Sequence, residues 1–443
     1  MFRTVYIPVG VPTFDQAAAG EMLQKSAALL RTLDPEIDAP EGLLLGADKV
    51  SAFTAGKTAD LAVIQNVTFA NGAYTAEALR KLDCPVLLWT PEEPVADTGR
   101  LKLNALTGAF SAANMLTAFG RPFCYVYGSP DDPRTEKELA AVFAAARVKK
   151  QLKELNVLQI GHTPQGFGFG RALDGELQSA FGCNIISIEA RELIDKAKTF
   201  TDEDAAPYLA KAKQSIRGLE KIDEKNVLDF ARLYKAYDEY VRDNKIGALS
   251  SRCWPDFFTS FGTPVCAVLA MLNDIGVPAA CEADTYGALS MYAAAQMTGK
   301  PAYFGDPVAL NREENIVTFW HCGTAACTLA REDTGACAGV HCNRRIGPTL
   351  EFGCKAEPAV TILRIGKDGS GQFRILCASG EALDKPQQYF GTSLVVKTDC
   401  NASDFIRGAV EYGWEPHYAV AMGDVSGAVK ALGKMLGIEV FAF

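Results

Sequence analysis

Residues 277–306 read V-P-A-A-C-E-A-D-T-Y-G-A-L-S-M-Y-A-A-A-Q-M-T-G-K-P-A-Y-F-G-D, and this stretch decides the expected fold. Its apolar runs at 277–281 and 301–304 predict two strands, and the segment 284–297 predicts a helix that Asp284 can cap. A strand–helix–strand unit nearly always has a right-handed crossover, which makes its two strands parallel. The sequence therefore predicts neighbouring parallel strands in an α/β sheet.

An acidic residue follows each of these two predicted strands. Glu282 comes directly after the first strand, and Asp306 comes shortly after the second. The carboxyl ends of neighbouring strands lie roughly 5 Å apart, so we expect the two carboxylates to converge on one small volume. Two anions at that separation repel unless a cation or a shared proton lies between them, and a divalent metal is the simplest solution.

Two of the four histidines stand in a similar context and are candidate nitrogen ligands. His321 ends the next apolar run, directly after Trp320, and His417 precedes the apolar run Y-A-V-A-M. Carboxylates mixed with imidazoles suit Mn²⁺ or a similar first-row ion better than they suit calcium. These residues indicate a metal centre or an acid/base site.

The rest of the chain indicates three domains. Residues 1–148 alternate short apolar runs with helical patterns, and residues 149–300 do so again, so each predicts a Rossmann-like α/β domain with a parallel sheet. Residues 301–443 contain T-I-L-R-I, Q-F-R-I-L and S-L-V-V-K-T, which predict a β-rich C-terminal domain. This division places Glu282 in the second domain and Asp306 in the third.

Composition and charge argue against several classes of protein. The 443-residue chain is 48% hydrophobic and 22% charged, as in a globular protein, and its net charge of −9 disfavours nucleic acid as a partner. No run approaches the roughly 20 apolar residues of a membrane span, so no membrane partner is expected. The N-terminal sequence lacks a signal-peptide pattern, and 13 cysteines indicate a reducing compartment, so we expect a cytoplasmic protein.

A structural zinc site is an alternative interpretation of the cysteines. The candidate ligands are Cys322, Cys327, Cys337 and Cys342, with His321 and His341 beside them. Their C-x4-C spacings are looser than those of the usual zinc ribbon. We therefore expect substitution of Cys337 and Cys342 by serine to leave bound zinc unchanged.

A dinucleotide site is an alternative interpretation of the segment G-F-G-F-G-R at 166–171, which follows a predicted strand. Glu189, nineteen positions past Gly170, stands where an acidic ribose ligand would be expected. However, Arg171 occupies the position of the third glycine in the dinucleotide fingerprint. The loop is therefore better explained as a tight turn between strand and helix, and no NAD(P)H binding is expected.

Four motifs resemble a known family. They are R-C-W-P-D-F at 252–257, A-C-E-A-D at 280–284, F-G-D-P at 304–307 and E-P-H-Y-A-V at 415–420. Together they resemble the L-fucose isomerase branch of the L-fucose/L-arabinose isomerase superfamily, over most of the chain after about residue 150. The 24 positions between the two acidic residues of the second and third motifs also fit that branch.

The resemblance implies a set of site residues. It implies that Glu282, Asp306 and His417 hold Mn²⁺ and that the two carboxylates are also the catalytic acid/base groups. His321 is similar to a further metal histidine, but that histidine belongs to the arabinose isomerase branch. We therefore place His321 among the substrate-binding residues and not among the metal ligands. A trimer or hexamer with shared sites is also implied.

The implied reaction is aldose–ketose isomerisation of an open-chain sugar. The metal would bind O1 and O2 and acidify the hydrogen on C2. One carboxylate would remove that proton to give a cis-enediol, and the proton would return at C1. Trp254 and Trp320 are candidate apolar walls for the CH faces of the sugar.

The substrate is the weakest part of the resemblance, because the chain is shorter than typical fucose isomerases in its first and last domains. The segment V-H-C-N-R-R-I-G-P adds Arg344 and Arg345 to an acidic protein. These arginines favour an anionic sugar such as sulfoquinovose beside a fucose- or arabinose-like aldose, although an ordinary surface charge pair is the alternative. A sugar-binding or regulatory protein without turnover is the alternative function, and it would not need both Glu282 and Asp306.

Overall fold

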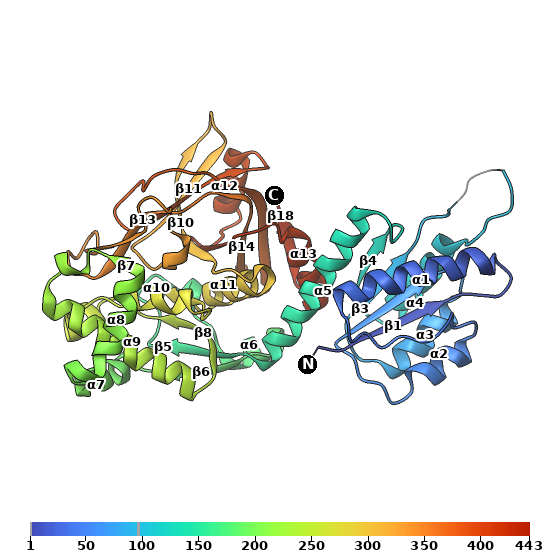
Figure 1. Cartoon of the computed structure of the whole chain (residues 1–443), viewed down its shortest axis with the longest axis horizontal. Helices are drawn as coiled ribbons and strands as arrows, with labels where there is room; N and C mark the ends of the chain where they lie inside the picture. Colours follow the sequence, from blue (N-terminus) through green and yellow to red (C-terminus); the bar gives the residue numbers. More distant parts are fainter. Residues whose placement is uncertain (1, 95–97) are drawn as a thin grey trace. The chain divides into compact units, whose positions relative to one another are not determined.

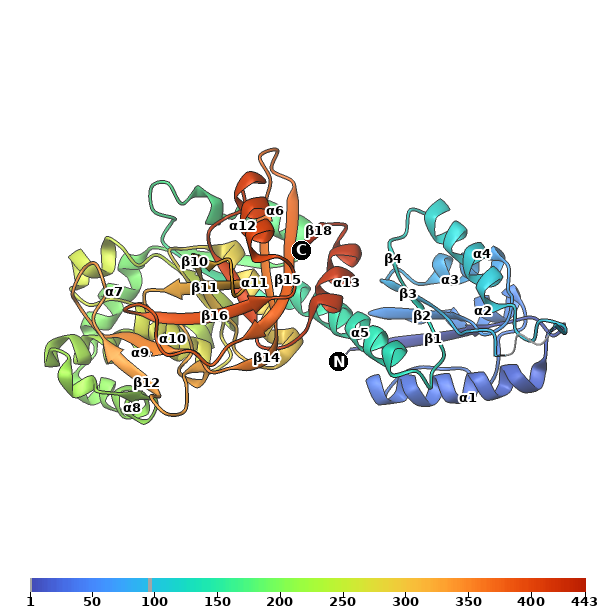
Figure 2. The same ribbon diagram turned by 90° about the horizontal axis from the view of Figure 1, so that it is seen from above.

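The computed structural model describes residues 2–94 and 98–443 (Figures 1 and 2). The chain divides into two compact units, and each is described by itself. The first contains the residues up to 151 together with 427–438, and the second contains 152–426 together with 439–443.

The first unit is built on a four-stranded parallel sheet of order β1-β2-β3-β4. Every residue of β1, β2 and β3 is buried, as expected for parallel strands with both faces covered. Figure 2 shows α1 on one face of this sheet and α2 to α4 on the other. The elements are β1 (Thr4–Val9), α1 (Gln16–Leu33), α2 (Ala47–Thr54), β2 (Leu61–Asn66), α3 (Gly72–Lys81), β3 (Val86–Thr90), α4 (Ala105–Ala118), β4 (Phe123–Tyr127), α5 (Pro133–Glu154) and α13 (Ser426–Leu436).

The second unit begins with another four-stranded parallel sheet, of order β6-β5-β8-β9. Buried side chains of its helices and strands join one large hydrophobic core that also includes strands of the next sheet. The elements are β5 (Asn156–Ile160), α6 (Asp174–Phe181), β6 (Asn184–Ile188), α7 (Ala190–Thr199), α8 (Asp202–Ser215), β7 (Ile216–Arg217), α9 (Glu224–Asp243), β8 (Ile246–Ser251), α10 (Cys266–Asp274), β9 (Ala279–Cys281) and α11 (Thr285–Thr298).

The same unit continues into a ten-stranded, mostly antiparallel sheet of order β18-β15-β14-β17-β10-β11-β16-β13-β12-β7. A further pairing between β15 and β16 closes its central strands into a barrel. The elements are β10 (Tyr303–Asn311), β11 (Ile316–His321), β12 (Ala336–Gly339), β13 (Thr349–Gly353), β14 (Glu357–Lys367), β15 (Phe373–Ala382), β16 (Thr392–Thr398), α12 (Ala402–Glu411), β17 (Tyr418–Ala421) and β18 (Glu439–Ala442). The predicted fold class, two parallel α/β sheets followed by a β-rich part, is confirmed.

One expectation about the strand–helix–strand unit is wrong. The helix is present and Asp284 caps it, but β9 and β10 are not neighbours: β9 ends the parallel sheet, whereas β10 pairs antiparallel with β11 and β17. Both edges of β10 are occupied, one by its hairpin partner β11 and the other by β17, so no edge is left to pair with β9.

Among the described residues, no helix is both long and apolar enough to cross a bilayer.

Candidate active site

The backbone just after β9 projects Glu282 away from the sheet. Glu282 and Ala283 have φ values of 59° and 54°, in the left-handed region that non-glycine residues rarely adopt. The turn is held because the Ala283 N–H donates to the Ser251 carbonyl, 3.0 Å away, and the Asp284 N–H donates to the Cys281 carbonyl. Strained backbone of this kind persists where the surroundings fix it, and it is common at functional sites.

His417 lies between three carboxylates at the start of β17. Its Nδ1 lies 2.9 Å from Asp284 Oδ2, and its Nε2 lies 3.0 Å from Glu282 Oε2 and 3.5 Å from Asp306 Oδ1. The imidazole is almost fully buried. Burial lowers the pKa of His417, but its hydrogen bonds to Asp284 and Glu282 outweigh burial and raise the pKa to about 10.

Asp306 comes from a strand of the barrel, whereas Glu282 follows a strand of the parallel sheet. It lies in β10, and its neighbour Gly305 pairs with Tyr418 of β17, which directly follows His417. The two carboxylates predicted to converge, Glu282 and Asp306, therefore both lie beside one histidine nitrogen. They do so from two different sheets.

The two carboxylates have pKa values displaced in opposite directions. Burial raises the pKa of Glu282, but the hydrogen bond and the charge of His417 outweigh burial, so its pKa lies below the usual value. Burial also raises the pKa of Asp306, and there the histidines only partly offset it, so its pKa lies above the usual value. Such a divergent pair is typical of acid/base sites.

Asp284 has a role beyond capping α11. Its Oδ1 accepts from the Gly287 N–H at 2.8 Å, and both of its oxygens accept from the guanidinium of Arg364, at 2.6 and 3.0 Å. Arg364 comes from β14 and is fully buried. Burial raises the pKa of Asp284, but the Arg364 charge outweighs it and holds this pKa well below its usual range.

The donor set fits a divalent cation. Asp284 fixes Nδ1 of His417, so Nε2 is the nitrogen that faces Glu282 and Asp306, as in the carboxylate–histidine pairs that orient metal ligands. His321, at the end of β11, completes the cluster: ligand atoms of Glu282, His321 and His417 all lie within 4.8 Å of one another. Glu282, Asp306, His321 and His417 would hold the ion.

Aromatic side chains enclose the cluster. The Trp254 indole N–H donates to Glu282 Oε1 at 3.2 Å, and Phe167 meets the Trp254 ring edge-on. Phe167 and Phe169 also lie against His417, with ring centroids 6.2 and 5.4 Å away. Both phenylalanines belong to the glycine-rich loop, so this loop packs on the site.

Gly170 shows why that loop carries glycine. A Cβ at this position would lie 2.8 Å from the Cα of Asp284, closer than a methyl group can approach. The loop backbone therefore reaches the residue that orients His417, and this close contact accounts for the glycine at position 170.

The two arginines of the V-H-C-N-R-R segment have different surroundings. The Arg344 guanidinium lies 5.1 Å from the centre of the Trp254 ring and 5.0 Å from that of Phe258. Arg345 is exposed and has a φ of 58°. Of these two arginines, Arg344 is therefore the one that stacks on Trp254, the residue whose indole N–H donates to Glu282.

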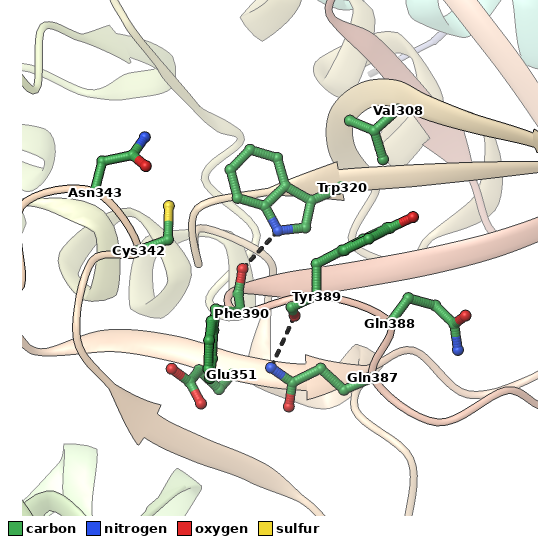
Figure 3. Close-up of a pocket in the computed structure, with 9 residues that line it drawn as sticks. All are labelled: Val308, Trp320, Cys342, Asn343, Glu351, Gln387, Gln388, Tyr389 and Phe390. Carbon is green, nitrogen blue, oxygen red and sulfur yellow. Dashed lines mark hydrogen bonds between the residues drawn. The ribbon is translucent and has the colours of Figure 1, made fainter.

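Trp320 lines a pocket of about 760 Å³ (Figure 3). Its indole N–H donates to the Phe390 carbonyl at 2.6 Å, which holds the ring against the wall. Trp320 pairs with Asp306 across β10 and β11, and directly opposed residues of a ladder project from the same face of the sheet. The pocket therefore opens on the side of the sheet from which Asp306 projects. The other lining residues are Val308, Cys342, Asn343, Glu351, Gln387, Gln388 and Tyr389.

Comparison with known proteins identifies the family. The model of the L-fucose isomerase C-terminal domain matches residues 321–443. A sulfoquinovose isomerase of Clostridium sp. (strain MSTE9) is 51% identical over 439 residues, which cover 99% of this chain and 98% of that protein. Sulfoquinovose isomerases of Alkalicoccus urumqiensis and Priestia aryabhattai are 35% and 36% identical, over 98 to 99% of each chain. The chain belongs to the fucose isomerase-like sugar isomerases.

Membership of the fucose isomerase-like sugar isomerases confirms the resemblance found in the sequence motifs. Because the named relatives are isomerases over their full length, this chain is an aldose–ketose isomerase, and the alternative of a sugar-binding protein without turnover is wrong. Sequence reasoning missed Arg364 and the role of Asp284 toward His417. The only sequence signal for that role was the aspartate in A-C-E-A-D, which capping already explained.

Proposed function

We propose that this protein is a metal-dependent isomerase of sulfoquinovose, an aldohexose with a sulfonate on C6. The observation that carries the proposal is the position of Glu282 and Asp306, both beside Nε2 of His417. The substrate follows from the relatives, which are named for sulfoquinovose at up to 51% identity over nearly the whole chain.

Glu282, Asp306, His417 and His321 would hold the cation, with Mn²⁺ favoured by their mixture of carboxylates and imidazoles. When bound, the cation polarises O1 and O2 of the open-chain sugar and so acidifies the hydrogen on C2. Arg364 and Asp284 keep Nδ1 of His417 occupied, so that its Nε2 stays directed at the reacting end of the site.

The two carboxylates carry the protons. One removes the proton from C2, which gives a cis-enediol, and delivers a proton to C1 after exchange with solvent; the other moves the hydroxyl proton from O2 to O1. Atoms balance, because the ketose differs from the aldose only in where these two hydrogens lie. Trp254 holds Glu282 in place through its indole N–H, and Phe167 beside it limits access of water.

Arg344 is the proposed partner of the sulfonate. Among the residues that the structure describes, it has no salt bridge to a carboxylate, and its guanidinium lies over the ring that also contacts Glu282. A planar guanidinium binds oxyanions through two parallel hydrogen bonds. Because the Arg344 guanidinium has no carboxylate partner among the described residues, its positive charge can attract the sulfonate end of the sugar. O1 and O2, at the other end, would then reach the carboxylates.

A substrate panel tests the proposal. The protein is incubated with Mn²⁺ and sulfoquinovose, glucose, glucose 6-phosphate or L-fucose, and ketose is measured by NMR. We expect ketose chiefly from sulfoquinovose and its loss in excess chelator, restored by Mn²⁺. Full activity in chelator would contradict the metal, and preference for a neutral sugar would contradict the substrate.

A further inference from the structure

A group of thiols lies next to His321, outside the carboxylate cluster. Cys281 ends β9 and is fully buried, and Cys322 directly follows β11 and is half-buried. Ligand atoms of Cys281, His321 and Cys322 all lie within 4.8 Å of one another. The proposed isomerisation uses neither thiol, so the two sulfurs have no part in the function described above, whereas His321 belongs to both groups.

The geometry of this group is close to that of a metal site. Cys322 Sγ lies 3.5 Å from His321 Nδ1. A tetrahedral zinc ion with a sulfur at about 2.3 Å and a nitrogen at about 2.0 to 2.1 Å separates these two ligand atoms by about 3.6 Å. The distance between the Cys322 sulfur and the His321 nitrogen therefore already suits a tetrahedral zinc site. The Cys281 sulfur would have to move toward these two atoms by no more than about 1 Å.

A further sulfur, from Cys266, lies near Cys322. Cys266, at the start of α10, lies with His341 within 4.8 Å of Cys322. In the described residues, Cys322 thus forms metal-type groups with Cys266 and Cys281, and with none of Cys327, Cys337 or Cys342. These partners come from other elements and were not among the cysteines that the zinc interpretation of the sequence considered.

We propose that Cys281, Cys322 and His321 form a second metal site, selective for a thiophilic divalent cation such as Zn²⁺ or Cd²⁺. Thiolates select soft cations, whereas carboxylates with imidazoles suit Mn²⁺, so the two adjacent sites differ in the ions they prefer. Binding releases the thiol protons to solvent and forms two metal–sulfur bonds and one metal–nitrogen bond. Cys266 can supply a fourth ligand.

The sites share His321, and this sharing makes them antagonistic. A cation on Nδ1 of His321 would lie next to a cation held by Glu282 and His417, because the one ring belongs to both groups, and the two positive charges repel each other. Thiophilic cations should therefore inhibit the enzyme even with the carboxylate site saturated with Mn²⁺. This inhibition rests on the proposed function, but the binding itself does not.

The test is a Cd²⁺ titration of the full-length protein in excess Mn²⁺ and a reductant that is not a thiol. We expect one equivalent of Cd²⁺ to bind with a sulfur-to-cadmium charge-transfer band in the ultraviolet. Cys322→Ser should remove the band, and Cys281→Ser should weaken binding by more than about tenfold. Cys337→Ser, half-buried like Cys322, and Cys354→Ser, buried like Cys281, should bind as the wild type does.

A second measurement does not depend on variants that fold. In the wild-type protein, Cd²⁺ should protect Cys322 from alkylation, mapped by mass spectrometry, and leave Cys337 reactive. Absence of a charge-transfer band in the wild type, its persistence in Cys322→Ser, or equal alkylation of Cys322 with and without Cd²⁺ would each overturn the proposal. None of these readouts requires isomerase activity, so failure of the thiol site and failure of the proposed function are distinguishable.

Discussion

At the scale of single residues, the site is organised by a chain of contacts that ends on His417. Arg364 fixes Asp284 with two hydrogen bonds, Asp284 fixes Nδ1 of His417, and Nε2 then faces Glu282 and Asp306. Arg364 and Asp284 thus hold His417, and through it the side of the ring that faces the two proposed catalytic carboxylates. This is the arrangement by which outer contacts tune metal ligands.

Asp284→Asn tests that chain of contacts. The substitution removes the charge that Arg364 needs, and breaking a buried ion pair costs about 3–5 kcal/mol of stability. It should also weaken Mn²⁺ binding by about 10- to 100-fold. Chemical denaturation and a Mn²⁺ titration would measure the two effects.

Asp223→Asn is the matched control, because Asp223 caps α9 through its side chain and, within the part of the chain that the structure describes, has neither arginine nor histidine as a partner. Asparagine still caps a helix, so this variant should be almost neutral. Equal effects of the two substitutions would mean that Asp284 only caps its helix.

Arg344→Gln tests recognition of the sulfonate. It should raise KM for sulfoquinovose by at least about tenfold, since a hydrogen bond to a charged group contributes about 1.5–3 kcal/mol, while a neutral aldose should be little affected. Arg345→Gln is the control, because Arg345 is exposed and does not lie over Trp254. If the two variants raise KM alike, the effect is one of general charge, and Arg344 is not the specific partner.

At the scale of elements, the sequence predicted the helix at α11 well and its surroundings poorly. Asp284 caps its start as expected, and Gly299 ends it, because capping is a local property. The neighbour of β10 was wrong, because pairing depends on the hairpin to β11 and on β17, which lies more than a hundred residues later. Glu282, Asp306 and His417 were predicted from strand ends and motifs, and the structure places them side by side. Arg364 was not predicted, because it is 80 positions from Asp284 and only the fold brings the two together.

The glycine-rich loop carries a prediction at this scale. Gly170→Ala would place a methyl group 2.8 Å from the Asp284 Cα, so the loop with Phe167 and Phe169 should shift away from His417. Overpacking of this kind costs about 1–3 kcal/mol, and kcat/KM should fall by about tenfold or more. Steady-state kinetics and thermal denaturation would measure both.

Gly168→Ala provides the control within the same loop. A Cβ at Gly168 meets no atom within 4 Å, so this variant should behave almost as the wild type does. A loss of activity in Gly168→Ala equal to that in Gly170→Ala would show that the loop tolerates no alanine at all and that the contact with Asp284 is not the cause.

At the scale of the whole molecule, we propose an oligomer, as the sequence motifs implied, and the pocket that Trp320 lines offers a reason. Tyr389 and Phe390 line this pocket, and 48% and 65% of their respective surfaces are exposed. A large apolar area is therefore in contact with water. We expect a trimer or hexamer, hence a mass three or six times 47.6 kDa in light scattering. A monomer at micromolar concentration would contradict this expectation.

The central claim is that Glu282 and Asp306 move the protons of an aldose–ketose isomerisation, and deuterium tests it most directly. With sulfoquinovose and Mn²⁺ in D₂O, the wild-type protein should place carbon-bound deuterium on C1 of the ketose, measured by NMR. Glu282→Gln and Asp306→Asn, both folded by circular dichroism, should lose at least about 100-fold in rate. Ketose that forms without deuterium, or either variant turning over as the wild type does, would contradict the account.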